Sequence, residues 1–226
     1  MFCGVYDLCV YDLCDTWLQE AYVKGSDNRN AYGFGDSSLD LSADGNTMAV
    51  GVRSDRNLLV GLESQQINGT VGHSGSVYIF TRSQSGWRQQ AFLKASNILF
   101  NSNFGGTVSL SGDGNTLAVG SFGETGLSTG VFRGEYNPGI NFESFTFLPS
   151  VGAAYLFERS GDDWSQLAYI KASNTEAFDR FAGSLDLSGD GNTLAISAGS
   201  EASAATGING DQEDNSAPGS GAVYLY

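Results

Sequence analysis

The segment Leu-Ser-Gly-Asp-Gly-Asn-Thr-Leu-Ala-Val, residues 110–119, occurs in three closely similar copies along the chain. The other copies are Leu-Ser-Ala-Asp-Gly-Asn-Thr-Met-Ala-Val at 41–50 and Leu-Ser-Gly-Asp-Gly-Asn-Thr-Leu-Ala-Ile at 187–196. In each copy, residues of alternating apolar and polar character precede an Asp-Gly-Asn turn. A run of small and apolar residues follows the turn. Gly after Asp accepts the positive φ that a tight strand reversal requires. Each copy therefore predicts a β-hairpin.

Other sequence markers repeat in step with these hairpins. The motif Trp-x-Gln-x-Ala-aromatic-apolar-Lys begins at Trp17, Trp87 and Trp164, and its Trp and Lys positions advance by 70 and then 77 residues. A shared period of this kind indicates one structural unit whose insertions fall in loops. We therefore expect an irregular N-terminal segment at 1–14 and a repeat region at 15–226. The repeats cover about 15–86, 87–163 and 164–226.

The second repeat predicts four antiparallel strands. They are expected at 104–111, 115–120, 153–157 and 164–171. The third is apolar on both faces and should be buried between sheets, whereas the fourth ends in a polar stretch and should be the outer strand. The chain has 31 Gly and 3 Pro in 226 residues, with little helical periodicity, so we expect an all-β fold. Four-stranded antiparallel units placed side by side are the blades of a β-propeller.

The order of motifs in each repeat resembles the FG-GAP repeat of integrin-α-like β-propellers. The resemblance is carried by Phe-Gly before the hairpin and apolar-Gly after it. These pairs are Phe34-Gly35 with Val50-Gly51, and Phe104-Gly105 with Val119-Gly120. The third copy departs at both glycines, with Phe181-Ala182 and Ile196-Ser197. The resemblance covers about residues 15–226 and implies a propeller of about three blades.

Three blades fall short of the four to eight that usually close a propeller. The chain also starts on a fourth strand and stops on a third strand, at 221–226. We therefore expect an incomplete propeller. It is either a part of a longer repeat region or a protomer that completes its ring in a homo-oligomer.

The resemblance also implies a candidate calcium site, because integrin-type repeats often hold Ca²⁺ in an Asp-rich loop between the first two strands. Oxygen-rich loops suit this hard cation. The candidate ligands here are Asp40, Asp44, Asp113, Asp186 and Asp190. The turns lack the later carboxylate of the calcium-binding pattern. We therefore favour the alternative, in which these Asp side chains accept hydrogen bonds from backbone amides across the turn. Calcium is the one cofactor that the sequence does not exclude.

Composition and motifs exclude several classes of partner and activity. The formal net charge is −14, which repels phosphate backbones and anionic lipid, so nucleic acid is not expected as a partner. No run of about 18 apolar residues occurs, so we expect no membrane insertion. The single histidine, His73, lies outside any catalytic motif, and no phosphate-binding loop or nucleophile elbow is present. We therefore expect no enzymatic activity.

The connectivity of an up-and-down blade predicts where binding occurs. The connections between second and third strands all leave one end of the blades, and here they are long, at about 53–74, 121–152 and 198–220. Long loops on a rigid scaffold are often functional. The middle loop combines aromatic residues with arginine, as protein-recognition sites do. Its candidate binding residues are Phe132, Arg133, Tyr136, Phe142 and Phe145. The alternative is that these aromatic side chains fold back over a blade.

The resulting hypothesis is a non-catalytic binding or adhesion module that recognises a protein partner through its long-loop face. The resemblance implies an extracellular or cell-surface location, although the first residues lack the basic and then apolar pattern of a signal peptide. The first alternative is a carbohydrate-binding propeller, which would need polar and aromatic pockets in every blade. A second is a purely structural repeat region of a larger extracellular protein.

Overall fold

The computed structural model describes residues 18–26, 33–56, 72–97, 100–136 and 150–226. The predicted N-terminal segment at 1–14, Trp17, Phe142 and Phe145 lie outside these residues. All regular elements in the described part are strands. No helix in these ranges has the length and apolar character needed to cross a membrane.

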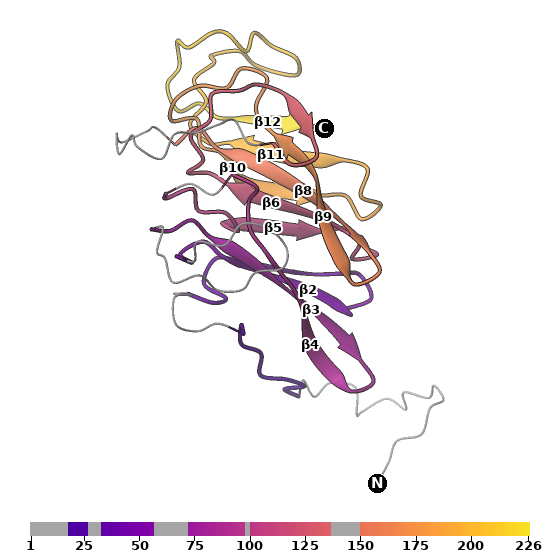
Figure 1. Cartoon of the computed structure of the whole chain (residues 1–226). Coiled ribbons are helices and arrows are strands. Elements are labelled where there is room, and N and C mark those ends of the chain that lie inside the picture. The colour runs from indigo at the N-terminus through magenta and orange to yellow at the C-terminus, as the bar shows by residue number, and fades with distance from the viewer. Residues whose placement is uncertain (1–17, 27–32, 57–71, 98–99, 137–149) are drawn as a thin grey trace.

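Three antiparallel sheets are arranged side by side along the chain (Figure 1). In spatial order, the first contains β1 (Ser38–Leu41), β2 (Thr47–Val52), β3 (Ser76–Ser83) and β4 (Gly86–Leu93). The second contains β5 (Thr107–Leu110), β6 (Thr116–Ser121), β8 (Ala153–Ser160), β9 (Asp163–Ile170) and β7 (Val131–Arg133). The third contains β10 (Phe181–Leu187), β11 (Leu194–Ala198) and β12 (Ala222–Leu225). We call these sheets blades 1, 2 and 3. The predicted all-β fold of propeller blades is confirmed.

The three Asp-Gly-Asn segments form the tight turns that begin each blade. Gly45, Gly114 and Gly191 have φ of 67°, 67° and 72°, which a residue without Cβ adopts at little cost. The turns join β1 to β2, β5 to β6 and β10 to β11, and the paired strands are antiparallel. The local sequence therefore fixes the position of each hairpin.

Equivalent aromatic residues form the same packing in each blade. Phe104 packs edge-on against Tyr155 and Phe157, with ring centroids 5.2 and 6.0 Å apart. Phe34 and Phe181 occupy the same position in the other blades, and Phe181 packs 5.5 Å from Tyr224. Such ring pairs add about 0.5–1.5 kcal/mol each to the stabilisation from burial. The repeated phenylalanine is thus a core residue at the start of each blade.

The glycines near the end of the second hairpin strand permit close contact between blades. A Cβ on Gly51 would lie 2.1 Å from the carbonyl oxygen of Gly105, and one on Gly120 would lie 2.5 Å from that of Ala182. Both contacts cross from one blade to the next. Ser197 has the equivalent position in blade 3 and is half-buried. Its hydroxyl accepts the amide of Ser184 and donates to the carbonyl of Ser184, in the same blade.

The predicted outer position of the fourth strand is wrong for blade 2. A three-residue strand of the middle long loop, β7, pairs with the outer edge of β9, with Val131 opposite Ile170. Tyr169 and Ile170 of β9 are consequently buried. The first five residues of the third strand are buried in blade 1 and buried or half-buried in blade 2, as expected. Trp87 and Trp164 lie at equivalent positions, opposite Arg82 and Arg159.

Candidate functional site

All three long connections leave their blades at the end where the second strand finishes and the third begins. The ladders close there through the pairs Val52 with Ser76, Ser121 with Ala153, and Ala198 with Ala222. The β3–β4 and β8–β9 hairpins point to the opposite end (Figure 1). We call these the long-loop end and the hairpin end. The predicted clustering of long connections at one end of each blade is confirmed.

A buried carboxylate holds the base of the long loop in blade 2. Glu124 lies just after β6, and its Oε2 is 2.7 Å from Nζ of Lys171, with both side chains fully buried. Its Oε1 accepts hydrogen bonds from Asn97 of the preceding blade and from the amide of Gly126. Its backbone oxygen accepts the amides of residues at the end of the same loop, Val151 and Gly152. The two ends of the loop are therefore fixed to each other and to β9.

Blade 1 contains the same arrangement with a shorter acid. Asp55 lies 3.4 Å from Nζ of Lys94, and both side chains are buried. Nζ of Lys94 donates to the carbonyl of Gly75 at 2.6 Å, and the amide of Gly75 donates to the backbone oxygen of Asp55. Burial lowers the pKa of Lys94 from 10.5 to about 8, although the charge of Asp55 opposes this shift. Burial likewise lowers the pKa of Lys171, against the opposing charge of Glu124.

Glu201 has the equivalent position in blade 3 and is also buried. It accepts hydrogen bonds from Asn174 of blade 2 and from the amide of Ser203, and its backbone oxygen accepts the amide of Gly221. We call Asp55, Glu124 and Glu201 the root acids. Within the described ranges, Glu201 differs from the other two in having no salt bridge to a lysine or arginine.

A pocket of about 740 Å³ opens beside Glu201, between the third long loop and β12. Tyr224 lines it, and the hydroxyl of Tyr224 donates to Asn174 just as that of Tyr155 donates to Asn97 in blade 2. Beside Tyr155 and Glu124, the corresponding space holds Tyr169 of β9 and Lys171, the residue directly after β9. The pocket is thus the place that a fourth strand occupies in the other blades.

The aromatic residues of the middle loop stack on blade 2. Tyr136 lies between Phe132 and Tyr169, with ring centroids 4.1 and 5.3 Å away, and both Phe132 and Tyr136 are half-buried. Arg133, on β7 between them, is exposed. The loop thus uses part of its aromatic surface to cover the blade and leaves the guanidinium group in solvent. A binding role for Phe132, Arg133 and Tyr136 stays a prediction.

The candidate calcium ligands lie in turns whose oxygens already accept hydrogen bonds. Asp44 accepts from the hydroxyl of Ser42 at 2.6 Å and from the amide and side chain of Asn46, each at 2.9 Å. Asp113 and Asp190 make the equivalent contacts. The Ser42 hydroxyl, followed by the Asn46 amide, lowers the pKa of Asp44 from 3.8 to about 2. These are the hydrogen bonds that the favoured structural role predicts.

The two remaining candidates lie between blades. Asp40 accepts the amide of Leu110 at 2.7 Å, and Asp186 accepts the hydroxyl of Ser109 at 3.3 Å. In the part of the chain that the structure describes, no three His, Cys, Asp or Glu side chains converge to hold a metal ion. A Ca²⁺ ion requires six to eight oxygen ligands, and the oxygens of these turns are directed to amides and hydroxyls instead. The residues present therefore do not fit a calcium site.

Comparison with protein families agrees with this geometry. Residues 87–133 match a family model described as the FG-GAP repeat. The chain carries an FG-GAP repeat. The matched segment begins on β4 of blade 1 and runs through β5 and β6 to β7, so the FG-GAP repeat joins two neighbouring blades. Comparison with curated proteins gives no match for this chain. The resemblance to the FG-GAP repeat is thus confirmed for residues 87–133, which contain Phe104-Gly105 and Val119-Gly120.

The root acids are the main feature that sequence analysis missed. The lysines were visible in the Trp-x-Gln motif, but their partners lie far away in sequence. Glu124 and Lys171, for example, are 47 positions apart. A signal was nevertheless present, because the three root acids advance by 69 and then 77 residues, as the Asp-Gly-Asn turns do. A search for an acidic residue at a fixed distance after each apolar-Gly pair, or its equivalent in the third copy, would have identified them.

Proposed function

We propose that this chain is a non-catalytic protein-binding module of the integrin-α-like propeller type, and that its long-loop end is the binding surface. The observation that carries this proposal is the root acid at the base of each long loop, with an ion pair in blades 1 and 2. It fixes the ends of loops that differ in length and sequence. A rigid base with variable loops is the arrangement that recognition proteins use.

The charge of the third loop favours a partner with a basic surface. Asp211, Glu213 and Asp214 lie in this loop, and residues 199–221 contain no lysine or arginine. Asp211 and Glu213 are exposed, and Asp214 is half-buried. Hydrogen bonds from Ser216 and from the amide of Ala204 lower the pKa of Asp214, so its carboxylate stays ionised in mild acid. Complementary charge mainly accelerates association and selects the partner.

Families with FG-GAP repeats are generally non-catalytic and are typical of extracellular and cell-surface proteins. Both properties support a binding role outside the cell for this chain. The aromatic side chains of the middle loop are partly used in packing against Tyr169. This leaves Arg133 as its best-placed contact residue and favours a protein over a glycan, which usually requires open aromatic platforms.

Binding to arrays tests the proposal. Purified chain is applied to immobilised extracellular-matrix and cell-surface proteins, and in parallel to a glycan array, at low and at 0.5 M salt. We expect saturable binding to a protein with a basic surface. This binding should weaken at high salt, because salt screens the attraction between the acidic third loop and the basic partner. Binding to glycans alone, or to neither array, would overturn the proposal.

A further inference from the structure

The connection between β9 and β10, residues 171–180, exposes an aromatic side chain on a disfavoured backbone conformation. Phe178 has a φ of 73°, and its side chain is 61% exposed. At such a φ the Cβ atom approaches the backbone carbonyl oxygen, so a bulky residue there is an outlier. The fold thus holds Phe178 in a conformation that costs free energy and buries little of its ring in return.

The repeats show that the fold, and not the phenylalanine, sets this conformation. The equivalent of Phe178 in blade 2, 77 residues earlier, is Asn101, which has a φ of 59°. Two residues further on, Arg180 has a φ of 54°, and its equivalents Asn103 and Gly33 have φ of 57° and 81°. Gly and Asn are the residues that adopt such angles routinely. Blade 3 fills both positions with residues that do not.

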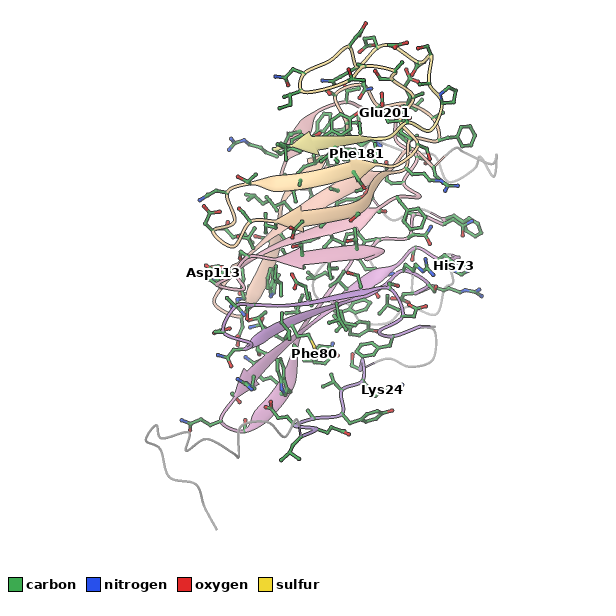
Figure 2. All side chains as sticks on the ribbon, turned by 180° about the vertical axis from the view of Figure 1, so that it is seen from behind. Lys24, His73, Phe80, Asp113, Phe181 and Glu201 are labelled. Atoms are coloured by element: carbon green, nitrogen blue, oxygen red, sulfur yellow. The ribbon has the colours of Figure 1, made fainter. Side chains whose placement is uncertain are left out.

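Hydrogen bonds to two long loops hold this backbone in place. The amide of Phe181 donates to the carbonyl of Val151 at 2.9 Å, at the end of the middle long loop. The carbonyl of Asp179 accepts the amide of Ser200 at 3.1 Å, at the start of the third long loop. Figure 2 shows Phe181 and Glu201, which lie next to this second contact in the chain. Strained residues persist where their surroundings fix them in this way.

The exposure of Phe178 belongs to its position in the blade. Asn101 has the same position at the start of blade 2 and is also exposed. Blade 2 has its fourth strand, β9, and blade 3 lies beside it. A side chain at this position therefore faces solvent even where the neighbouring strands are all present.

Arg180 presents a cation close to this ring. Its side chain is exposed, and none of the salt bridges among the described residues includes it. Because only one residue separates Phe178 from Arg180, their Cα atoms are at most about 7 Å apart. Both belong to the connection that leaves β9 at the long-loop end, where Ile170 pairs with Ala154. One contacting surface can therefore reach both side chains.

We propose that Phe178 and Arg180 anchor a protein partner at the long-loop end, with the Phe178 ring on apolar side chains of the partner and Arg180 on an adjacent carboxylate. This inference rests on the proposed function and names its point of contact. Aromatic residues and Arg are enriched at the centres of protein interfaces and carry much of the binding energy. A fixed backbone also reduces the entropy lost on binding. The net charge of −14 disfavours an anionic membrane as the alternative occupant.

The first test measures the cost of this conformation by thermal unfolding. Phe178→Asn should raise the melting temperature by about 2–6 °C, because Asn adopts a positive φ more readily than Phe. Leu127→Asn is the matched control, since Leu127 is 70% exposed and is not among the residues with positive φ. It should change the melting temperature by less than about 2 °C. A melting temperature that Phe178→Asn leaves unchanged or lowers would overturn the proposal.

The second test identifies the contact with a phage-displayed library of random peptides. Peptides are selected on the purified wild-type chain and counter-selected on the double variant Phe178→Asn with Arg180→Asn. The enriched peptides should combine apolar residues with Asp or Glu. Each should bind the wild-type chain at least about tenfold more tightly than the double variant, and Leu127→Asn should keep this affinity.

Three outcomes of the peptide selection would overturn the proposal. They are no enrichment, equal affinity of the enriched peptides for the wild-type chain and the double variant, and binding of the wild-type chain to phosphatidylserine vesicles but to no peptide. Failure of the proposed function gives a different result. The protein array would then capture nothing, while the enriched peptides would still require Phe178 and Arg180 and so support the anchor.

Discussion

The ammonium group of Lys171 lies 2.7 Å from Oε2 of Glu124, and neither side chain is accessible to solvent. The pair joins the end of β9 to the start of the middle long loop. Nζ of Lys171 also donates to the carbonyl of Gly152, at the other end of that loop. One lysine thus ties both ends of a loop of about 30 residues to the sheet. The stability of blade 2 and the placement of its loop depend on the same contact.

Lys171→Met should lower the free energy of unfolding by about 3–5 kcal/mol, because it leaves the carboxylate of Glu124 buried without its counter-ion. Adding Glu124→Gln removes the charge and keeps an oxygen for Asn97 and Gly126, so the double variant should recover most of the loss. Urea unfolding followed by circular dichroism measures both. Arg88→Met, which breaks an exposed pair, should cost less than about 1 kcal/mol. Equal losses for Lys171→Met and Arg88→Met would contradict the role of the root acid.

Asp44 should titrate with a pKa of about 2, well below its ordinary value of 3.8, because Ser42 and Asn46 donate hydrogen bonds to its ionised form. A pKa lowered by folding stabilises the fold above the ordinary value, and the contribution is lost as the pH falls from about 4 through 2. Carbon-13 NMR of the carboxyl group measures the midpoint. Ser42→Ala should raise it toward 3.8, whereas Ser83→Ala, at a different turn, should leave it unchanged. An Asp44 midpoint near 3.8 in the wild-type chain would show that the turn does not form as described.

Gly120→Ala should destabilise the chain by about 1–3 kcal/mol, because the added Cβ would lie 2.4 Å from Cγ2 of Thr107 in its own blade and 2.5 Å from the carbonyl oxygen of Ala182 in the next blade. Gly189→Ala is the matched control, since a Cβ added at this position of blade 3 would meet no atom within 4 Å. It should be neutral to within about 0.5 kcal/mol. Thermal unfolding of the two variants provides the comparison. Similar melting temperatures for both would contradict the close approach of blades 2 and 3.

The elements that the sequence predicted well depend on local chemistry. The Asp-Gly-Asn turns were predictable because Gly at positive φ and Asp at a turn act within four residues. The four-strand order of blade 1 followed from the repeat period, which predicts a fourth strand from Trp87, one residue after the observed start of β4 at Gly86. The third copy's departures also have a structural account. Ser197 has no blade packed against it, and Ala182 keeps a positive φ of 61° despite its Cβ.

The features that sequence analysis missed depend on contacts between distant residues. Strand β7 has three residues, and its Val131 pairs with Ile170, which lies 39 positions further along the chain. No local sequence pattern therefore predicts this pairing. The Lys171–Glu124 pair likewise joins two polar residues that single-sequence patterns place on the surface. For Phe132 and Tyr136, the sequence left open both a binding role and packing back over a blade, but it did not identify Tyr169 as the residue that they pack against.

The central claim is that the long-loop end binds a protein partner. Its most direct test is the affinity of a protein captured on the array for two sets of variants, measured by surface plasmon resonance. Arg133→Ala, and separately Asp211→Asn with Glu213→Gln and Asp214→Asn, should each weaken binding at least about tenfold. Arg88→Ala with Asp162→Asn, at the hairpin end, should change it less than about twofold. Loss of binding in the hairpin-end variant with full binding in both long-loop variants would contradict the account.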